Sequence, residues 1–363
     1  MNNRIGWIFI ALLVMAVLAA GCNQPYVVDR ISMVNALGLD KQGDQYLGTA
    51  IYSEYDPKEK LMLTQGAGQT TQLIRQMQMH EPKPLRLGKL HMLLFSRELA
   101  EEGIIAFIHS ICRDPLISSL MNVAVSDLPA ERLMKGLEKK GGRMLPHKLI
   151  EQNVKEGNLP ETSLHRFLFD YYGPGRDAFM PYLGLDRNES LEVKGIAIYR
   201  DDKLKLVLGN KDAVSFKMLQ PSYRRAYVEI QGEGQRSDVP AVLSILSGKT
   251  RLELARGQDG ASEGVVVHST ITGLLKEQLD PNERDEERSY DQVERVTEAQ
   301  LEQRLYVLLR KFQTTGVDPV GIGDFMRSRH REWQEETFYA DTYPELKLAV
   351  KVNVKLKESG VGE

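Results

Sequence analysis

The alternation of apolar and charged residues is sharpest near the C-terminal end of the chain. From Leu346 to Leu356 every even position is apolar, whereas the odd positions include Lys347, Lys351 and Lys355. Successive side chains of a strand point to opposite faces of a sheet, so a period of two places the apolar set on one face. The pattern predicts a strand over 346–356 with one buried face and one face in water.

Other elements are predicted from apolar runs and from the turn residues that flank them. Strands are predicted at 32–39, 46–55, 87–95, 121–125, 178–185, 191–199, 203–208, 226–230, 239–247, 250–255 and 264–275. Helices are predicted at 70–80, 96–111, 129–139, 146–154, 160–171, 212–219, 297–312 and 323–333. The polar stretch 40–44 joins the first two strands as a β-hairpin, and 56–68 is expected to be a loop.

The number and order of these elements predict an α+β protein. A chain of 363 residues exceeds one ordinary core, so we expect three mixed α/β domains built on antiparallel or mixed sheets. Gly173, Pro174 and Gly175 mark one plausible boundary, and the third domain opens near Arg225. The predicted units are an N-terminal domain at 31–172, a small middle domain at 173–224 and a C-terminal domain at 225–363.

The first residues have the pattern of an export signal. Arg4 precedes an uncharged apolar run over 5–20, which is short for a membrane span of ~20 residues but typical of a signal peptide. Small residues then lead to Gly21 and Cys22. This order predicts a lipoprotein signal peptide at 1–21, cleavage between Gly21 and Cys22, and a lipidated tether at 22–30. Cys22 would carry S-diacylglycerol and an N-palmitoyl group. The alternative is an uncleaved anchor helix with an incidental cysteine.

Charge and cysteine content narrow the classes of function. The formal net charge of −3 argues against nucleic-acid binding, which needs a clustered basic surface. With Cys22 acylated, only Cys112 remains, so no intrachain disulfide can form. His109 lies one helical turn before Cys112, but the apolar surroundings predict a buried, unreactive thiol.

No catalytic, cofactor or metal site is predicted. The seven histidines show no metal-ligand spacing, and His91, within an apolar strand, is expected to be a hydrogen-bonded core residue. Gly248-Lys249-Thr250 lacks the earlier glycine of a phosphate-binding loop and leads into a strand, so we discard it. Adjacent acidic residues are expected to lie on solvated faces, and nothing indicates a glycosidase pair.

The order of several short motifs resembles a known family, the GerC-type (Ger(x)C) lipoproteins, which are C subunits of the nutrient germinant receptors of endospore-forming bacteria. After the lipobox cysteine, the matching segments are 34–40, 87–100, 113–115, 194–199 with 202–204, 315–323, Trp333 and the last strand. Together they span nearly the whole chain. The sequence departs from the family pattern after the cysteine, where Asn23 and Gln24 stand in place of Trp-Asp.

The resemblance implies a three-domain, non-catalytic body that assembles with two integral membrane subunits, of A and B type, and touches the lipid bilayer through its acyl anchor. It implies a place on the outer face of the spore inner membrane and a role in triggering germination. The alternative functions are a transporter's solute-binding lipoprotein and, less favoured, a cell-envelope hydrolase. The first would need a deep interdomain cleft, and the second a close carboxylate pair in a groove.

Overall fold

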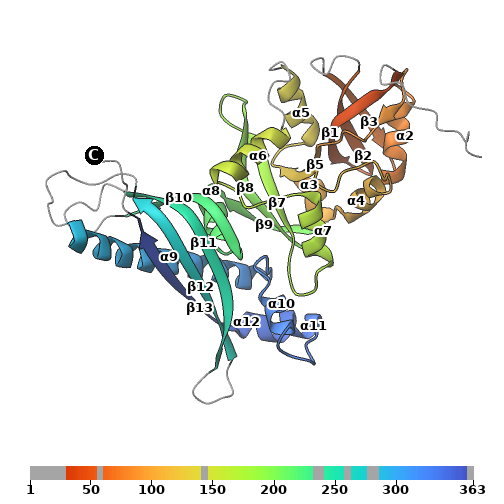
Figure 1. Ribbon diagram of the computed structural model, residues 1–363. Coiled ribbons are helices and arrows are strands. Elements are labelled where there is room, and N and C mark those ends of the chain that lie inside the picture. The colour runs from red at the N-terminus through yellow and green to blue at the C-terminus, as the bar shows by residue number, and fades with distance from the viewer. Residues whose placement is uncertain are drawn as a thin grey trace, which may run out of the picture.

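Two β-sheets, connected through a shared hydrophobic core, form the body of the protein (Figure 1). The computed structural model describes residues 30–54, 60–139, 146–231, 241–256, 263–275 and 286–357. The predicted signal peptide, its cleavage site and Cys22 lie outside these residues. Within them the predicted α+β class is confirmed.

The first sheet is built from the strands that precede residue 210. These are β1 (Ser32–Gln42), β2 (Gln45–Ser53), β3 (Leu61–Ala67), β4 (Leu85–Arg86), β5 (Met92–Ser96), β6 (Asn122–Ser126), β7 (Phe179–Leu185), β8 (Leu191–Arg200) and β9 (Lys203–Gly209). Their order is β3-β2-β1-β5-β6-β7-β8-β9, with β4 beside β1. The four central strands pair in parallel, and antiparallel hairpins extend the sheet at both sides.

Helices cover both faces of this sheet. They are α2 (Thr70–Gln78), α3 (Arg97–Glu102), α4 (Ile105–Cys112), α5 (Ala130–Lys139), α6 (Pro146–Glu156), α7 (Leu164–Tyr172) and α8 (Asn210–Met218). Buried residues of α2, α3, α4 and α7 share one apolar cluster, and those of α5, α6 and α8 share the other. Consecutive residues of the central strands are therefore buried, as expected when a parallel sheet is covered on both sides.

The sheet continues without a break across the predicted boundary at 173. β7 pairs with β6 on one side and with β8 on the other, so the strands assigned to a small middle domain extend the N-terminal sheet. A unit of that size buries little surface by itself, and joining a neighbouring sheet supplies the missing core. The division into 31–172, 173–224 and 225–363 stays a prediction.

The second sheet has four strands and one long helix. Its order is β10 (Ser222–Ile230), β11 (Ala241–Arg256), β12 (Glu263–Leu275) and β13 (Lys347–Leu356). Leucines of α9 (Glu286–Thr315) pack on the face formed by the even positions of β13. The remaining helices are α10 (Ile322–Arg327), α11 (Glu335–Thr337), the π-helix η3 (Phe338–Thr342) and α12 (Tyr343–Glu345). The alternation predicted for 346–356 is confirmed.

Glutamates of α9 protect the free edge of β13. The carboxylates of Glu302, Glu298 and Glu294 accept hydrogen bonds from backbone N–H groups of β13 at 2.9, 2.8 and 2.7 Å. These glutamates are spaced four apart, one helical turn, and their partners are residues 352, 354 and 356. The ladder satisfies donors that would otherwise be open to pairing with another strand.

Several local predictions differ from the structure; the helix predicted at 323–333, for example, ends at Arg327. The expected loop at 56–68 contains β3, which extends the first hairpin. The helix predicted at 96–111 is two helices, because the chain leaves helical geometry at Gly103. The strands predicted at 239–247 and 250–255 are one strand, β11, whose Gly248 lies under the ring of Tyr223. An added Cβ there would come within 2.0 Å of Cζ of that ring, which explains a glycine in the middle of a strand.

Candidate functional site

The residues singled out from sequence do not meet in one place. Cys22 and Gly21 lie outside the described residues, so lipidation and cleavage stay predictions. His91 was predicted to be a core residue, and this is wrong: its side chain is exposed directly before β5. Cys112 is also exposed, at the last turn of α4, because the apolar face of that helix is formed by Phe107, Ile108 and Ile111. Across the described ranges no group of three potential metal ligands occurs.

The most elaborate polar arrangement lies where the two sheets meet. The segment 173–177, which follows α7, runs beside 317–324, which follows α9. Gly175 donates its N–H to Glu335 Oε1 at 2.9 Å and accepts from the Asp324 N–H at 2.8 Å. Its φ of +77° and a virtual Cβ only 2.3 Å from Asp324 N leave no room for another residue. The predicted boundary glycine is thus a point of close contact.

Asp318 organises the C-terminal side of this junction. Its carboxylate accepts hydrogen bonds from the backbone N–H groups of Gly321, Ile322 and Gly323 at 2.9, 3.0 and 2.7 Å. The hydroxyl of Tyr339 donates a fourth at 3.0 Å. Asp318 is 0% exposed, so these four donors replace all of the water that an exposed carboxylate would bind. The turn into α10 is built around this side chain.

Asp177 joins the N-terminal side to Asp318. The backbone N–H of Asp318 donates to Asp177 Oδ2 at 2.6 Å, and the Asp177 N–H donates to the Asp318 carbonyl at 3.0 Å. Arg200, from the end of β8, donates to Asp177 Oδ1 at 3.5 Å and lies 4.1 Å over the ring of Tyr339. One arginine therefore contacts both sides of the junction.

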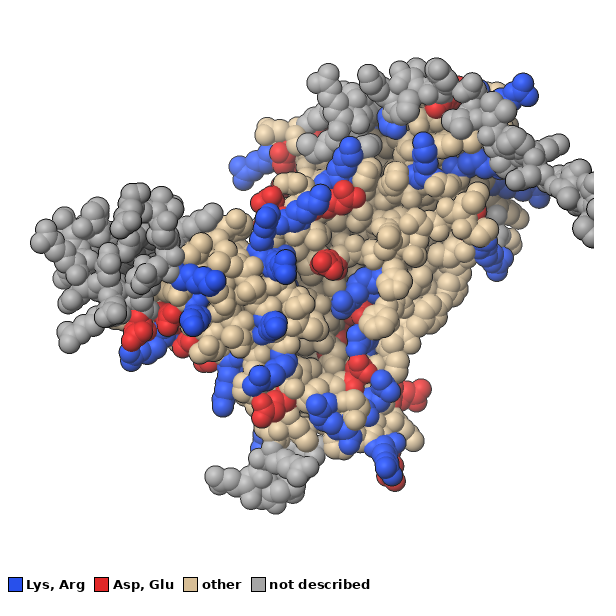
Figure 2. Space-filling view, viewed as in Figure 1, with Lys and Arg blue, Asp and Glu red and all other residues tan. Residues whose placement is uncertain are grey.

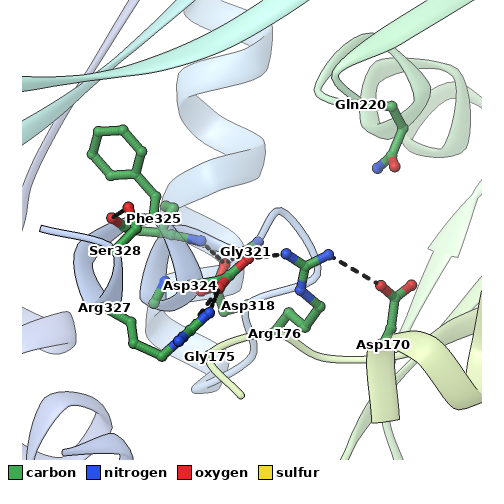
Figure 3. A network of polar contacts seen from close by, with 12 residues as sticks. Asp170, Gly175, Arg176, Gln220, Asp318, Gly321, Asp324, Phe325, Arg327 and Ser328 are labelled. Atoms are coloured by element: carbon green, nitrogen blue, oxygen red, sulfur yellow. Dashed lines mark hydrogen bonds and ion pairs between the residues drawn. The ribbon is translucent and has the colours of Figure 1, made fainter. Parts of the chain in front are cut away.

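A second arginine completes the network on the side shown in Figure 3. Arg176 forms an ion pair with Asp324 of α10 and lies 3.6 Å from Asp170 of α7. Asp324 also pairs with Arg327 at 2.8 Å, and Asp170 with Arg166 at 2.6 Å. Arg176 therefore links an acidic residue of α7, which covers the first sheet, to an acidic residue of α10, which follows α9 of the second sheet.

Burial sets the protonation behaviour of the junction. The pKa of Asp177 is raised to about 7, mainly because burial disfavours its charged form, with Arg200 acting in the opposite direction. Burial also raises the pKa of Asp318, against the pull of its backbone donors and Tyr339. Burial would raise the pKa of Asp324 too, but its bonds to Arg327 and Arg176 outweigh this and lower it.

Aromatic side chains form a second, apolar connection between the two sheets. Phe216 of α8 lies edge-to-face against Phe179 of β7, with centroids 4.9 Å apart, and against Phe312 of α9, at 5.8 Å. All three rings are buried. The polar groups of the junction bond one another and the aromatic rings seal the core beside them, so the arrangement holds the two sheets in one orientation. This does not match the open, convergent cleft that a solute-binding protein needs.

The four-stranded sheet also has an open, basic face. Arg251 of β11, His268 of β12 and Lys351 of β13 are cross-strand neighbours on the face opposite α9. The exposed cations of this face are Arg224, Lys249, Arg251, Lys347, Lys351 and Lys355, and its carboxylates are Glu229 and Glu253. Figure 2 shows Lys and Arg outnumbering Asp and Glu over these strands. The protein thus has a locally positive surface although its formal net charge is negative.

Fold and junction define a class: an α+β protein of two sheets held against each other, with an exposed basic face on the second sheet. None of the helices in the described ranges is long and apolar enough to cross a membrane. The family model "Spore germination protein N-terminal domain" matches residues 26–185, and the model "Spore germination B3/ GerAC like, C-terminal" matches 194–360. The chain belongs to the Ger(x)C family of spore germination proteins.

Two individual proteins match nearly the whole chain. Spore germination protein GerQC of Bacillus cereus is 24% identical over 363 residues, which cover 98% of this chain and 99% of that protein. The crystal structure of the GerBC protein matches with a TM-score of 0.59 at 14% identity, covering 89% of this chain and 97% of that one. The second likeness shows a shared fold.

Proposed function

We propose that this chain is the non-catalytic, lipid-anchored C subunit of a spore nutrient germinant receptor. The observation that carries the proposal is the match of the two family models, in order, to residues 26–185 and 194–360. The lipobox at Cys22 supports an anchor on the outer face of the spore inner membrane. The proposed partners are two integral membrane subunits and the bilayer that holds the acyl chains.

The geometry of the two sheets supports a role in which the protein acts by contacting its partner subunits. The junction keeps the two sheets in one orientation, so surfaces on both can meet partner subunits at fixed positions. The basic face of β10 to β13 is exposed, and its charge fits an acidic partner surface. The polar groups of the junction are already engaged with one another, which does not favour the solute-binding alternative.

The test combines lipid labelling with a germination assay. A strain lacking the gene and any paralogue is complemented with the native chain, with Cys22→Ala, or with Cys112→Ala as the matched control. We expect labelled fatty acid to enter the native chain and the Cys112→Ala chain but not Cys22→Ala. After nutrient addition, optical density should fall in spores that carry the native or the Cys112→Ala chain but not in spores that carry Cys22→Ala. Normal germination of the deletion strain, or full activity of a membrane-bound Cys22→Ala chain without label, would contradict the proposal.

A further inference from the structure

A basic pocket in the N-terminal half shares no lining residue with the junction and is not used by the proposed receptor role. It has a volume of about 290 Å³ and lies between the ends of β1 and β2, the residues before β5, and the first turn of α6. We propose that this pocket binds a small oxyanion with two negative charges, such as a phosphate group. Its size suits a small ligand or a lipid headgroup, since ligand pockets begin at ~300 Å³.

The ionisable side chains that line the pocket are all bases. Lys60, Lys89, Lys148, His91 and His147 contribute to its wall, and no carboxylate does so among the described residues. Within the same part of the chain, none of the three lysines has a carboxylate within ion-pair distance. Cations gathered without a counter-ion repel one another, and a dianion would remove that repulsion.

The polar floor of the pocket is built by an irregularity in β1. The register of β1 against β2 shifts between residues 34 and 36, so Asn35 is an extra residue in the strand. Its Oδ1 accepts hydrogen bonds from Lys60 Nζ at 2.8 Å and from Ser53 Oγ at 3.2 Å. Its carbonyl accepts the N–H of His91 at 2.9 Å. The bulge thus gathers three lining residues around one buried amide.

His147 is the buried donor of the site. It is 9% exposed, it lines the pocket, and neither ring nitrogen has a hydrogen-bond partner in the described part of the chain. Its ring centroid lies 5.1 Å from that of His91. His147 and Lys148 also belong to the first turn of α6, an eleven-residue helix whose N-terminal end adds positive potential. A buried polar side chain without a protein partner points to a ligand.

Two pKa shifts agree with this geometry. Burial lowers the pKa of His147, and the neighbouring His91, Lys148 and Lys60 lower it further, while Glu151 on the same helix acts in the opposite direction. Burial and then Lys89 lower the pKa of Lys60. Both groups therefore hold their protons less tightly, first because they are buried and then because other cations lie nearby.

The probe for the test is inorganic phosphate. Equilibrium dialysis of the full chain in non-ionic detergent, with radiolabelled phosphate at fixed ionic strength, measures binding by the native chain and by Lys60→Gln, Lys148→Gln and Asn35→Asp. Lys203→Gln, an exposed lysine of β9, is the matched control. Saturable binding should weaken about tenfold or more in the two lysine variants, as expected for loss of a charge-assisted hydrogen bond. It should weaken also in Asn35→Asp, because the added carboxylate repels phosphate, and stay unchanged in the control.

Competition distinguishes the sources of the ligand. Displacement of labelled phosphate by short-chain phosphatidic acid more effectively than by glycerol phosphate, with no effect of the matching phosphatidylcholine, would assign the pocket to a lipid headgroup. Equal or better displacement by glycerol phosphate would assign it to a soluble ligand. Absence of saturable binding in the native chain would overturn the proposal. So would equal affinity in the Lys60→Gln, Lys148→Gln and Lys203→Gln chains, with circular dichroism showing that all are folded.

Discussion

The two sheets of this protein differ in how many of their faces are covered. The nine-stranded sheet has helices on both faces, so Leu93 and Leu94, neighbours in β5, are both buried at 0% and 1% exposure. The four-stranded sheet carries α9 on one face only, so buried Ile271 in β12 has the exposed Thr270 beside it. The first sheet is therefore a structural centre, whereas the second leaves one face exposed.

The largest expected effect tests this difference directly. Leu93→Ala and Leu94→Ala should each lower the free energy of unfolding by about 2–5 kcal/mol, because either change opens a cavity under a helix layer. In β12, Ile271→Ala should have a similar cost, but Thr270→Ala should change stability by less than about 0.5 kcal/mol. Urea denaturation followed by circular dichroism measures all four. A large loss in Thr270→Ala would mean that the second sheet is also covered on both sides.

The next effect concerns the connection between the sheets. Gly175→Ala should lower the free energy of unfolding by about 2–4 kcal/mol, because the new Cβ strains a left-handed backbone and collides with Asp324 N. Gly316→Ala is the matched control, since Gly316 has a φ of +73° and nothing within 4 Å of an added Cβ. That variant should lose only about 1 kcal/mol, for the backbone strain alone. Equal losses would show that the close approach at residue 175 does not matter.

The pH dependence of the junction gives a smaller effect. The pKa of folded Asp177, about 7, lies above its ordinary value of 3.8, so its stabilising contribution is complete below 3.8 and is lost as pH rises through 7. Between these values the native chain should lose up to about 1.4 kcal/mol per pH unit relative to Asp177→Asn.

The comparison with Asp177→Asn is needed because a second buried group titrates in a neighbouring pH range. Burial lowers the pKa of Lys217 to about 8, and its effect is common to both chains. Urea midpoints from pH 5 to pH 8 measure the difference in stability. Parallel pH profiles for the native and Asp177→Asn chains would contradict the assignment of Asp177.

The smallest effect lies at the free edge of the second sheet. Glu298→Ala should lower the free energy of unfolding by about 1 kcal/mol, because the Val354 N–H loses its acceptor. Gln303→Ala, on an exposed position of the same helix, should cause almost no change. Replacing Glu294, Glu298 and Glu302 together should also expose the edge to pairing, which analytical ultracentrifugation would detect as association. A monomeric triple variant would mean that the ladder does not protect the edge.

Local patterns in the sequence predicted much of the fold. The turn at 40–44, the helix starts at Pro129 and Pro146 and the lysine alternation at the C-terminal end each depend on residues close together in the chain, and the matching elements are present. The helix predicted from Pro160 begins later, at Leu164, where Ser163 caps it. β3 was missed because its glycine and polar residues weaken the apolar alternation. The glycine at position 248 led to a prediction of two strands where the structure has one, β11. The ring of Tyr223 explains this glycine, and that contact is distant in sequence.

The junction and the pocket were not predicted because both depend on long-range contacts. Asp177 and Asp318 are 141 positions apart, and neither has a local pattern that indicates a partner. Only the family resemblance, through 315–323, singles out the segment around Asp318. His91 was placed in the core because the residues around it are apolar, although it directly precedes the strand. The pocket combines that residue with a bulge and a helix start, which no single stretch of sequence reveals.

The most direct test of the central claim is affinity purification of the tagged chain from spore membranes in mild detergent, followed by mass spectrometry. A receptor subunit that acts by contact should bring down two multi-spanning membrane proteins in comparable amounts, and a chain with Lys351→Glu and Arg251→Glu on the open face should recover less of them. Recovery of the native chain alone, from membranes that contain both proteins, would contradict the account.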